Sequence, residues 1–221
     1  MSAAIADTIK ANNERLKRYQ ALETHAARLI GGWLPGVARW EVKKQLGYHL
    51  WEDLKHSQLV RTRLWELRIN TPDRDLDPGI TEAIERLAVA QHDYEAIAGI
   101  YLALKTELLA AYRRYAANTY QVYDHPSVIA LNAIIPGLAA QVEWANRVVK
   151  ELADTGDKRR NVQRWLTYAK DVVVAIGGVD GDSPRTEFPV PPPGYATLLP
   201  FSEARRDERF TIQVTSAPIP D

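Results

Sequence analysis

The sequence predicts an all-α protein, an antiparallel four-helix bundle with a fifth helix and an extended C-terminal tail rich in proline and glycine. Apolar residues recur every three or four positions over long stretches without proline, which is the period of an amphipathic helix. Eight of the 13 prolines lie beyond residue 180, where no apolar period remains. We therefore expect one bundle over residues 1–176 and a tail over residues 177–221 that packs on it.

Two long helices are expected at the start of the chain. The first covers residues 5–33, and the segment GGWLPG ends it because glycine and proline both interrupt helices. The second covers residues 37–68, and the tight connection between the two favours antiparallel neighbours. The prolines and aspartates of NTPDRDLDPG then break the chain.

The later elements are predicted from the same signals. They are a short helix at 81–89, long helices at 90–118 and from the DHPS turn to Leu152, and a fifth helix at 157–176. Asp124 or Ser127 of DHPS is expected to cap the fourth helix, and Pro136-Gly137 predicts a kink or a split inside it. The segment FTIQV in the tail is a candidate for a short strand.

Composition excludes several classes of function. The 28 basic and 28 acidic side chains give a net charge of zero, which argues against nucleic-acid and membrane-surface partners. The chain has no cysteine, so disulfides, thiolate metal sites and cysteine nucleophiles are excluded. The N-terminal stretch lacks the apolar core of a signal peptide, and no run reaches the ~18 apolar residues of a membrane span. A cytoplasmic protein is expected.

Polar residues enter the apolar face of the second helix at YHLWEDLKH. By the 100° helical step, Asp53 lies at the centre of that face, and His49 and His56 lie within a quarter turn of it. Glu52 points away and is expected to be solvated. A buried carboxylate is costly unless it is paired or bound to a metal.

The first helix offers a partner for these groups. Glu23 lies on its apolar stripe, about level with His49 across the GGWLPG turn, and Tyr19 lies about level with Asp53. Tyr101 of the third helix and Gln141 of the fourth are expected to line the same region. Neither of those helices places a carboxylate at the centre of its stripe.

These residues leave more than one interpretation open. Glu23, Asp53 and His56, with His49 as ligand or neighbour, could hold one iron, manganese or zinc ion with oxidoreductase-type chemistry. The alternative is a metal-free, non-catalytic bundle that serves as a scaffold or binds a partner. A third interpretation uses Asp53 and His56 as acid and base of a hydrolase or isomerase without metal.

Several segments resemble a bacterial ferritin-like superfamily of uncharacterised function. They are LIGGWLPGVARWEVKKQLGYHLWEDLKHSQLVRTRLWELR, YDHPSVIALNAI, VEWANRVV and, in the tail, AIGGVDG and RRDERF. The resemblance implies a ferritin-like fold over the four long helices. Metal-binding relatives carry an acidic run followed by His and Trp, where this chain has Leu138, Ala139 and Ala140, then Gln141 and Trp144. The resemblance therefore implies a degenerate di-iron site.

Tryptophan is frequent enough to suggest a partner surface. Of the six tryptophans, Trp33, Trp40 and Trp65 are candidates for exposure on the outside of the bundle. They favour a homodimer or a protein partner. The sequence identifies no small-molecule substrate.

Overall fold

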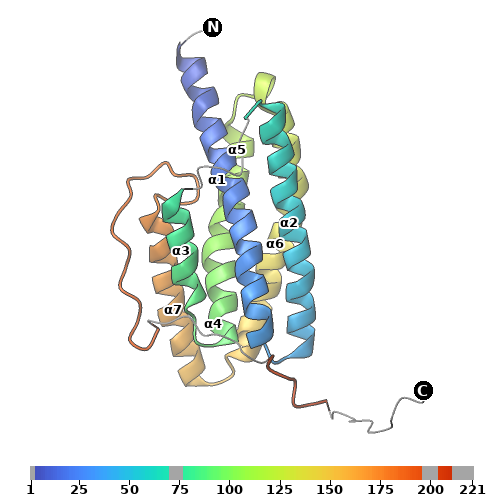
Figure 1. Cartoon of the computed structure of the whole chain (residues 1–221), viewed down its shortest axis with the longest axis vertical. Helices are drawn as coiled ribbons and strands as arrows, with labels where there is room; N and C mark the ends of the chain where they lie inside the picture. Colours follow the sequence, from blue (N-terminus) through green and yellow to red (C-terminus); the bar gives the residue numbers. More distant parts are fainter. Residues whose placement is uncertain (1–2, 70–76, 196–203, 211–221) are drawn as a thin grey trace, which may run out of the picture.

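The computed structural model describes residues 3–69, 77–195 and 204–210, with side chains from residue 8 onward. Within these ranges every regular element is a helix, which confirms the predicted all-α class. Helix α1 (Ala3–Trp33) leads through the short η1 (Leu34–Gly36) into α2 (Trp40–Glu66), which returns along it. The two long helices lie side by side along the long axis of the molecule (Figure 1).

A second run of helices completes the core. Helices α4 (Asp93–Ile97), η2 (Ala98–Lys105) and α5 (Thr106–Asn118) follow one another without a break in the helical backbone. Helix α6 (Gln121–Leu152) packs against this run and against α2. Two outer helices, α3 (Pro78–Ala88) and α7 (Gly156–Ala175), lie beside each other; α3 covers α1, and α7 covers η2 (Figure 1).

Helix η2 is a π-helix of eight residues, an unusual length for a conformation that mostly occurs as single turns. It brings its backbone close to α7 at Gly99. A Cβ at that position would lie 2.8 Å from Nε1 of Trp165, a completely buried side chain. Glycine is therefore the residue that this approach requires.

Helix α6 begins earlier than predicted and is continuous through Pro136-Gly137, where the sequence predicts a kink or a split. It begins at Gln121, so the DHPS segment lies inside the helix and does not cap it. The two prolines would leave the carbonyls of Val122 and Asn132 without intrahelical donors, and both of those residues are exposed to water. Asp124 is instead buried, where it accepts from Asn12 and Thr119.

One apolar core runs through these helices. It includes Trp33, so the predicted exposure of Trp33 is wrong. Trp40 and Trp65 are half-exposed, as expected. Helix α6 also has the length and apolar composition of a membrane span. The sequence-based expectation that no stretch of the chain is long and apolar enough is therefore wrong. Core helices of soluble proteins meet the same criteria, so this carries no conclusion about a membrane.

The described residues after Ala175 contain turns but no helix or strand. Arg18 of α1 holds the first of these turns by donating to the carbonyls of Ile176, Gly178 and Val179. Beyond the C-terminal end of α1, Asp207 of the tail accepts from the backbone N–H of Trp40, the first residue of α2. Residues 211–214, which complete the predicted FTIQV strand, lie outside the described residues.

Candidate metal centre

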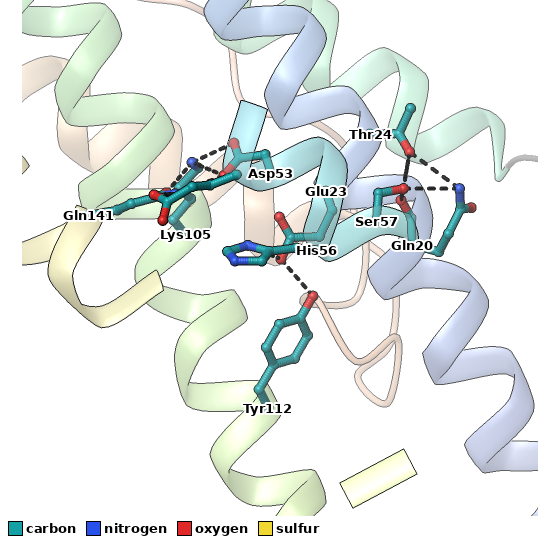
Figure 2. Close-up of polar contacts among 10 residues, drawn as sticks. Gln20, Glu23, Thr24, Asp53, His56, Ser57, Lys105, Tyr112 and Gln141 are labelled. Carbon is teal, nitrogen blue, oxygen red and sulfur yellow. Dashed lines mark hydrogen bonds and ion pairs between the residues drawn. The ribbon is translucent and has the colours of Figure 1, made fainter. Parts of the chain in front are cut away.

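A cluster of charged side chains lies inside the molecule, where α1, α2, η2, α5 and α6 meet (Figure 2). Glu23 comes from α1, and Asp53 and His56 come from consecutive turns of α2, which places all three on facing sides of the antiparallel pair. Glu23 and Asp53 have no exposed surface, and His56 is 7% exposed. We call these three residues the acidic triad.

The acidic triad has the composition and spacing of a metal site. One ligand atom from each residue lies within 4.8 Å of the other two, and Nδ1 of His56 is 3.7 Å from Oε1 of Glu23. That last distance is too long for a direct hydrogen bond. Two atoms that share a zinc ion at about 2.1 Å each are about 3–4 Å apart, so a small contraction would suit one ion.

Lys105 of η2 is the cation of the cluster. Its ammonium donates to both carboxylate oxygens of Asp53, at 2.8 and 2.6 Å, and to Oε1 of Gln141 at 2.5 Å. Gln141 in turn donates to Asp53 at 3.1 Å. Lys105 is completely buried, so its charge and that of Asp53 compensate each other away from water.

Tyrosines close the other side of the cluster. The hydroxyl of Tyr112 in α5 donates to Oε1 of Glu23 at 2.9 Å (Figure 2). Tyr19 packs edge-on against the Tyr112 ring at 4.9 Å, and its own hydroxyl donates to Asp180. Tyr19 therefore contacts the centre through Tyr112, although the sequence places it beside Asp53.

His49 lies outside the acidic triad. Its Nδ1 shares a 2.9 Å hydrogen bond with the Tyr101 hydroxyl, its Nε2 contacts the side-chain amide of Gln45, and its ring meets Trp144 edge-on. Burial, together with the nearby Lys105 charge, lowers the pKa of His49 to about 3. Its neutral ring positions Tyr101, whose face lies against the Lys105 ammonium at 4.4 Å.

The pKa values of Asp53 and His56 follow from burial and from the charges around them. Burial raises the pKa of Asp53 to about 6, with Glu23 adding to the rise and Lys105 opposing it. Burial alone would lower the pKa of His56, but the Glu23 and Asp53 carboxylates outweigh it and raise that pKa. The imidazole therefore carries a proton more readily than a free histidine does.

Two residues of this centre differ from the predictions made from the sequence. Glu52, expected in solvent, is half-buried and accepts from Gln141 at 3.1 Å. Lys105 was missed, although it stands four residues after Tyr101 and seven before Tyr112, on the same helical stripe. The spacing of Lys105 from these tyrosines places it on the stripe, but a lysine is not a side chain that a carboxylate and imidazole metal site predicts.

Comparison of the chain with protein-family models, with curated proteins and with solved structures finds no match. The geometry of the centre is therefore the basis for a functional proposal.

Proposed function

We propose that this protein is a ferritin-like bundle that holds one divalent transition-metal ion between Glu23, Asp53 and His56 and supports oxidoreductase-type chemistry there. Its support is the convergence of two carboxylates and an imidazole from α1 and α2 inside the molecule. Two carboxylates and one imidazole suit iron, manganese or zinc. The side-by-side packing of the long helices supports the ferritin-like assignment (Figure 1).

Unpartnered ligand atoms favour a bound ion. Among the described residues, Oε2 of Glu23 and Nδ1 of His56 are buried and have no hydrogen-bond partner. Leaving such atoms unpaired costs about 1–3 kcal/mol each, and more for a charged group. A shared cation would satisfy both at once, whereas Nδ1 of His56 lies 3.7 Å from Oε1 of Glu23, too far for a hydrogen bond, and that oxygen already accepts from Tyr112.

The surrounding residues of the chain have roles that fit this proposal. Lys105 fixes the Asp53 carboxylate while leaving a lone pair of Oδ2 available: Oδ1 accepts from both Lys105 and Gln141, whereas Oδ2 accepts from Lys105 and carries a second lone pair. Tyr112 orients Glu23 in the same way from the opposite side. Three protein ligands leave coordination positions for a small molecule, which is what a catalytic centre needs. A bound iron or manganese ion would supply one-electron chemistry.

Elemental analysis of protein purified without a histidine tag tests the proposal. We expect about one equivalent of iron, manganese or zinc per chain, or its uptake by stripped protein with a rise in Tm. Asp53→Asn and His56→Gln should each lose the metal and that rise. His125→Gln is the control, because His125 is exposed at the start of α6 and should change neither. Wild-type protein that neither contains nor takes up metal would exclude the proposal.

A second candidate function rests on Lys105. An ammonium on Asp53 and a protonated His56 beside Glu23 would balance the charge of the cluster without metal. The protein would then be a metal-free scaffold whose polar core fixes the register of its helices. The same elemental analysis separates the two candidates, because this one predicts no metal and no effect of added metal on Tm.

A further inference from the structure

Helix α2 carries a row of large side chains on its outer surface, opposite the acidic triad. Trp40, Trp51, Leu54 and Trp65 are each between 46% and 52% exposed. With Gly47 and Gln58 they fall within an arc of about 60° by the 100° helical step. We call these six residues the outer seam.

The spacing of the outer-seam residues is the same in both directions along α2. The intervals between these residues are 7, 4, 3, 4 and 7 positions. In a coiled coil, the residues that contact the partner helix are spaced three and four positions apart, so that every second one is seven apart. A pattern that is symmetric under reversal matches a copy of itself that runs the opposite way.

We propose that two copies of this chain associate through antiparallel contact of their α2 helices along the outer seam. A two-fold axis level with the midpoint between residues 52 and 53 would place Trp40 of one copy against Trp65 of the other. The same axis would place Trp51 against Leu54. Each contact occurs twice, as in any isologous interface.

The smaller members of the outer seam fit the same arrangement. Gln58 would face Gly47, and nothing lies within 4 Å of where a Gly47 Cβ would be, so the larger side chain has room there. Lys55 and Tyr48 flank the centre on one side and would face each other across the interface, where the Lys55 ammonium, 4.3 Å from the centre of the Trp51 ring in its own chain, would also meet the Tyr48 ring. Lys43 and Arg61 share the other flank and would face each other, but Lys43 donates to the carbonyl of Arg205 and the Arg61 guanidinium lies over the ring of Trp65 at 4.7 Å, which draws the two charges apart.

The exposed area is of the right order for a dimer. A buried aromatic side chain covers 150–250 Å², so the four large half-exposed side chains offer about 400 Å² per copy. The exposed Tyr48, which flanks the outer seam on α2, extends this surface to about 500 Å² per copy. Two copies would thus bury about 1,000 Å², the size that a specific interface needs.

Sedimentation velocity of the full chain tests the association. We expect a dimer at micromolar concentration, and a monomer for Trp51→Glu and for Leu54→Glu with unchanged far-UV circular dichroism. Val174→Glu is the control: it removes an equally exposed apolar side chain from α7 and should leave the dimer intact. A wild-type monomer would overturn the proposal. A monomer that binds anionic lipid vesicles through the outer seam would overturn it as well.

Single cysteines test the direction of the pairing, since the chain has none of its own. Residues 40 and 65 are about 37 Å apart along the helix at 1.5 Å per residue. Trp40→Cys protein mixed with Trp65→Cys protein should therefore give a crosslinked pair with a short thiol-reactive reagent, and neither variant should crosslink to itself. Efficient crosslinking of Trp40→Cys alone would show a parallel pairing and refute the antiparallel arrangement.

Discussion

Lys105 satisfies its hydrogen-bonding capacity completely inside the protein. An ammonium group has three donors, and the two oxygens of Asp53 and the amide oxygen of Gln141 accept all three. A buried charge is tolerated when it is both paired and fully hydrogen-bonded. Three elements thus depend on one another here, because Asp53 belongs to α2, Gln141 to α6, and Lys105 and Tyr101, whose ring lies against the ammonium, to η2.

Removal of the ammonium should be costly. Lys105→Met keeps the length of the side chain but leaves the Asp53 carboxylate buried with no cation beside it in the apo-protein. We expect a loss of about 3–5 kcal/mol in the free energy of unfolding, measured by urea denaturation of metal-free protein. Lys150→Met, at an exposed position of α6, should change it by less than about 0.5 kcal/mol. Equal effects of the two substitutions would contradict the buried ion pair.

The acidic triad should also give the apo-protein an unusual pH dependence. The pKa of Asp53 is about 6 in the folded chain, above the ~3.9 of an unfolded one, so the folded state holds the proton more tightly. Stability from this residue is therefore fully present below about pH 4 and is lost as pH rises to about 6, a change on the order of 3 kcal/mol. The raised pKa of His56 acts in the same direction at higher pH.

The measurement is a difference between two proteins. Other carboxylates are stabilised by ion pairs and lose stability in acid, so wild-type data alone mix opposite trends. The free energy of unfolding of wild type minus that of Asp53→Asn should fall between pH 4 and pH 6 in metal-free buffer. A difference that rises with pH over this window would show that Lys105 dominates the ionisation of Asp53.

Among the elements, the π-helical η2 places the centre most directly. It contains both Tyr101 and Lys105, and it contacts α7 where Gly99 meets Trp165. The wide turns of a π-helix are less favourable than α-helical ones and persist where packing enforces them. Contact with α7 on one side and the Lys105 ion pair on the other supplies that enforcement.

Gly99→Ala tests how tightly this element is packed. Alanine is the better helix former by about 1 kcal/mol, but its Cβ would lie 2.8 Å from Trp165 Nε1. We expect overpacking to dominate, with a net loss of about 1–2 kcal/mol in the free energy of unfolding. Gly32→Ala in α1, where nothing lies within 4 Å of the added Cβ, should be neutral or stabilising. Stabilisation by both substitutions would show that Trp165 moves aside freely.

Sequence patterns predict the long helices well and their details less well. Apolar periodicity located α1, α2, α6 and α7 and placed Glu23, Asp53 and His56 on inward faces, because each of these depends on one helix and its nearest neighbour. The start of α6 was wrong because proline is tolerated where the carbonyl four residues earlier reaches water. The π-helical form of η2 depends on packing between distant segments, which a local pattern does not contain.

At the scale of the whole molecule, Arg18 joins segments that are far apart in the sequence. Its guanidinium pairs with Asp77, which caps α3, and it also binds three carbonyls in the turn after α7. Arg185 reaches Asp77 from the tail side. One side chain of α1 thus fixes both the beginning of α3 and the departure of the chain from α7.

Arg18→Met should weaken this junction. The substitution leaves Asp77 with Arg185 alone and removes the donor from the three carbonyls, for an expected cost of about 2–4 kcal/mol. Urea denaturation gives the loss, and limited proteolysis should show faster cleavage within residues 177–195. Arg160→Met on the exposed face of α7 serves as the matched substitution, with no expected change in either measurement. Unchanged proteolysis of the Arg18 variant would show that other contacts hold the turn.

The capping of α2 by Asp207 has a consequence for biosynthesis. Trp40 and its acceptor are separated by 167 residues, so the ribosome makes the first turn of α2 long before the residue that caps it. At about 5–20 residues per second, that interval is roughly 10–30 s. During this time the exposed N–H groups at the start of α2 have only water as partners. A nascent chain released before residue 207 would therefore carry a frayed helix start next to Trp40, which a chaperone or protease could recognise as unfinished.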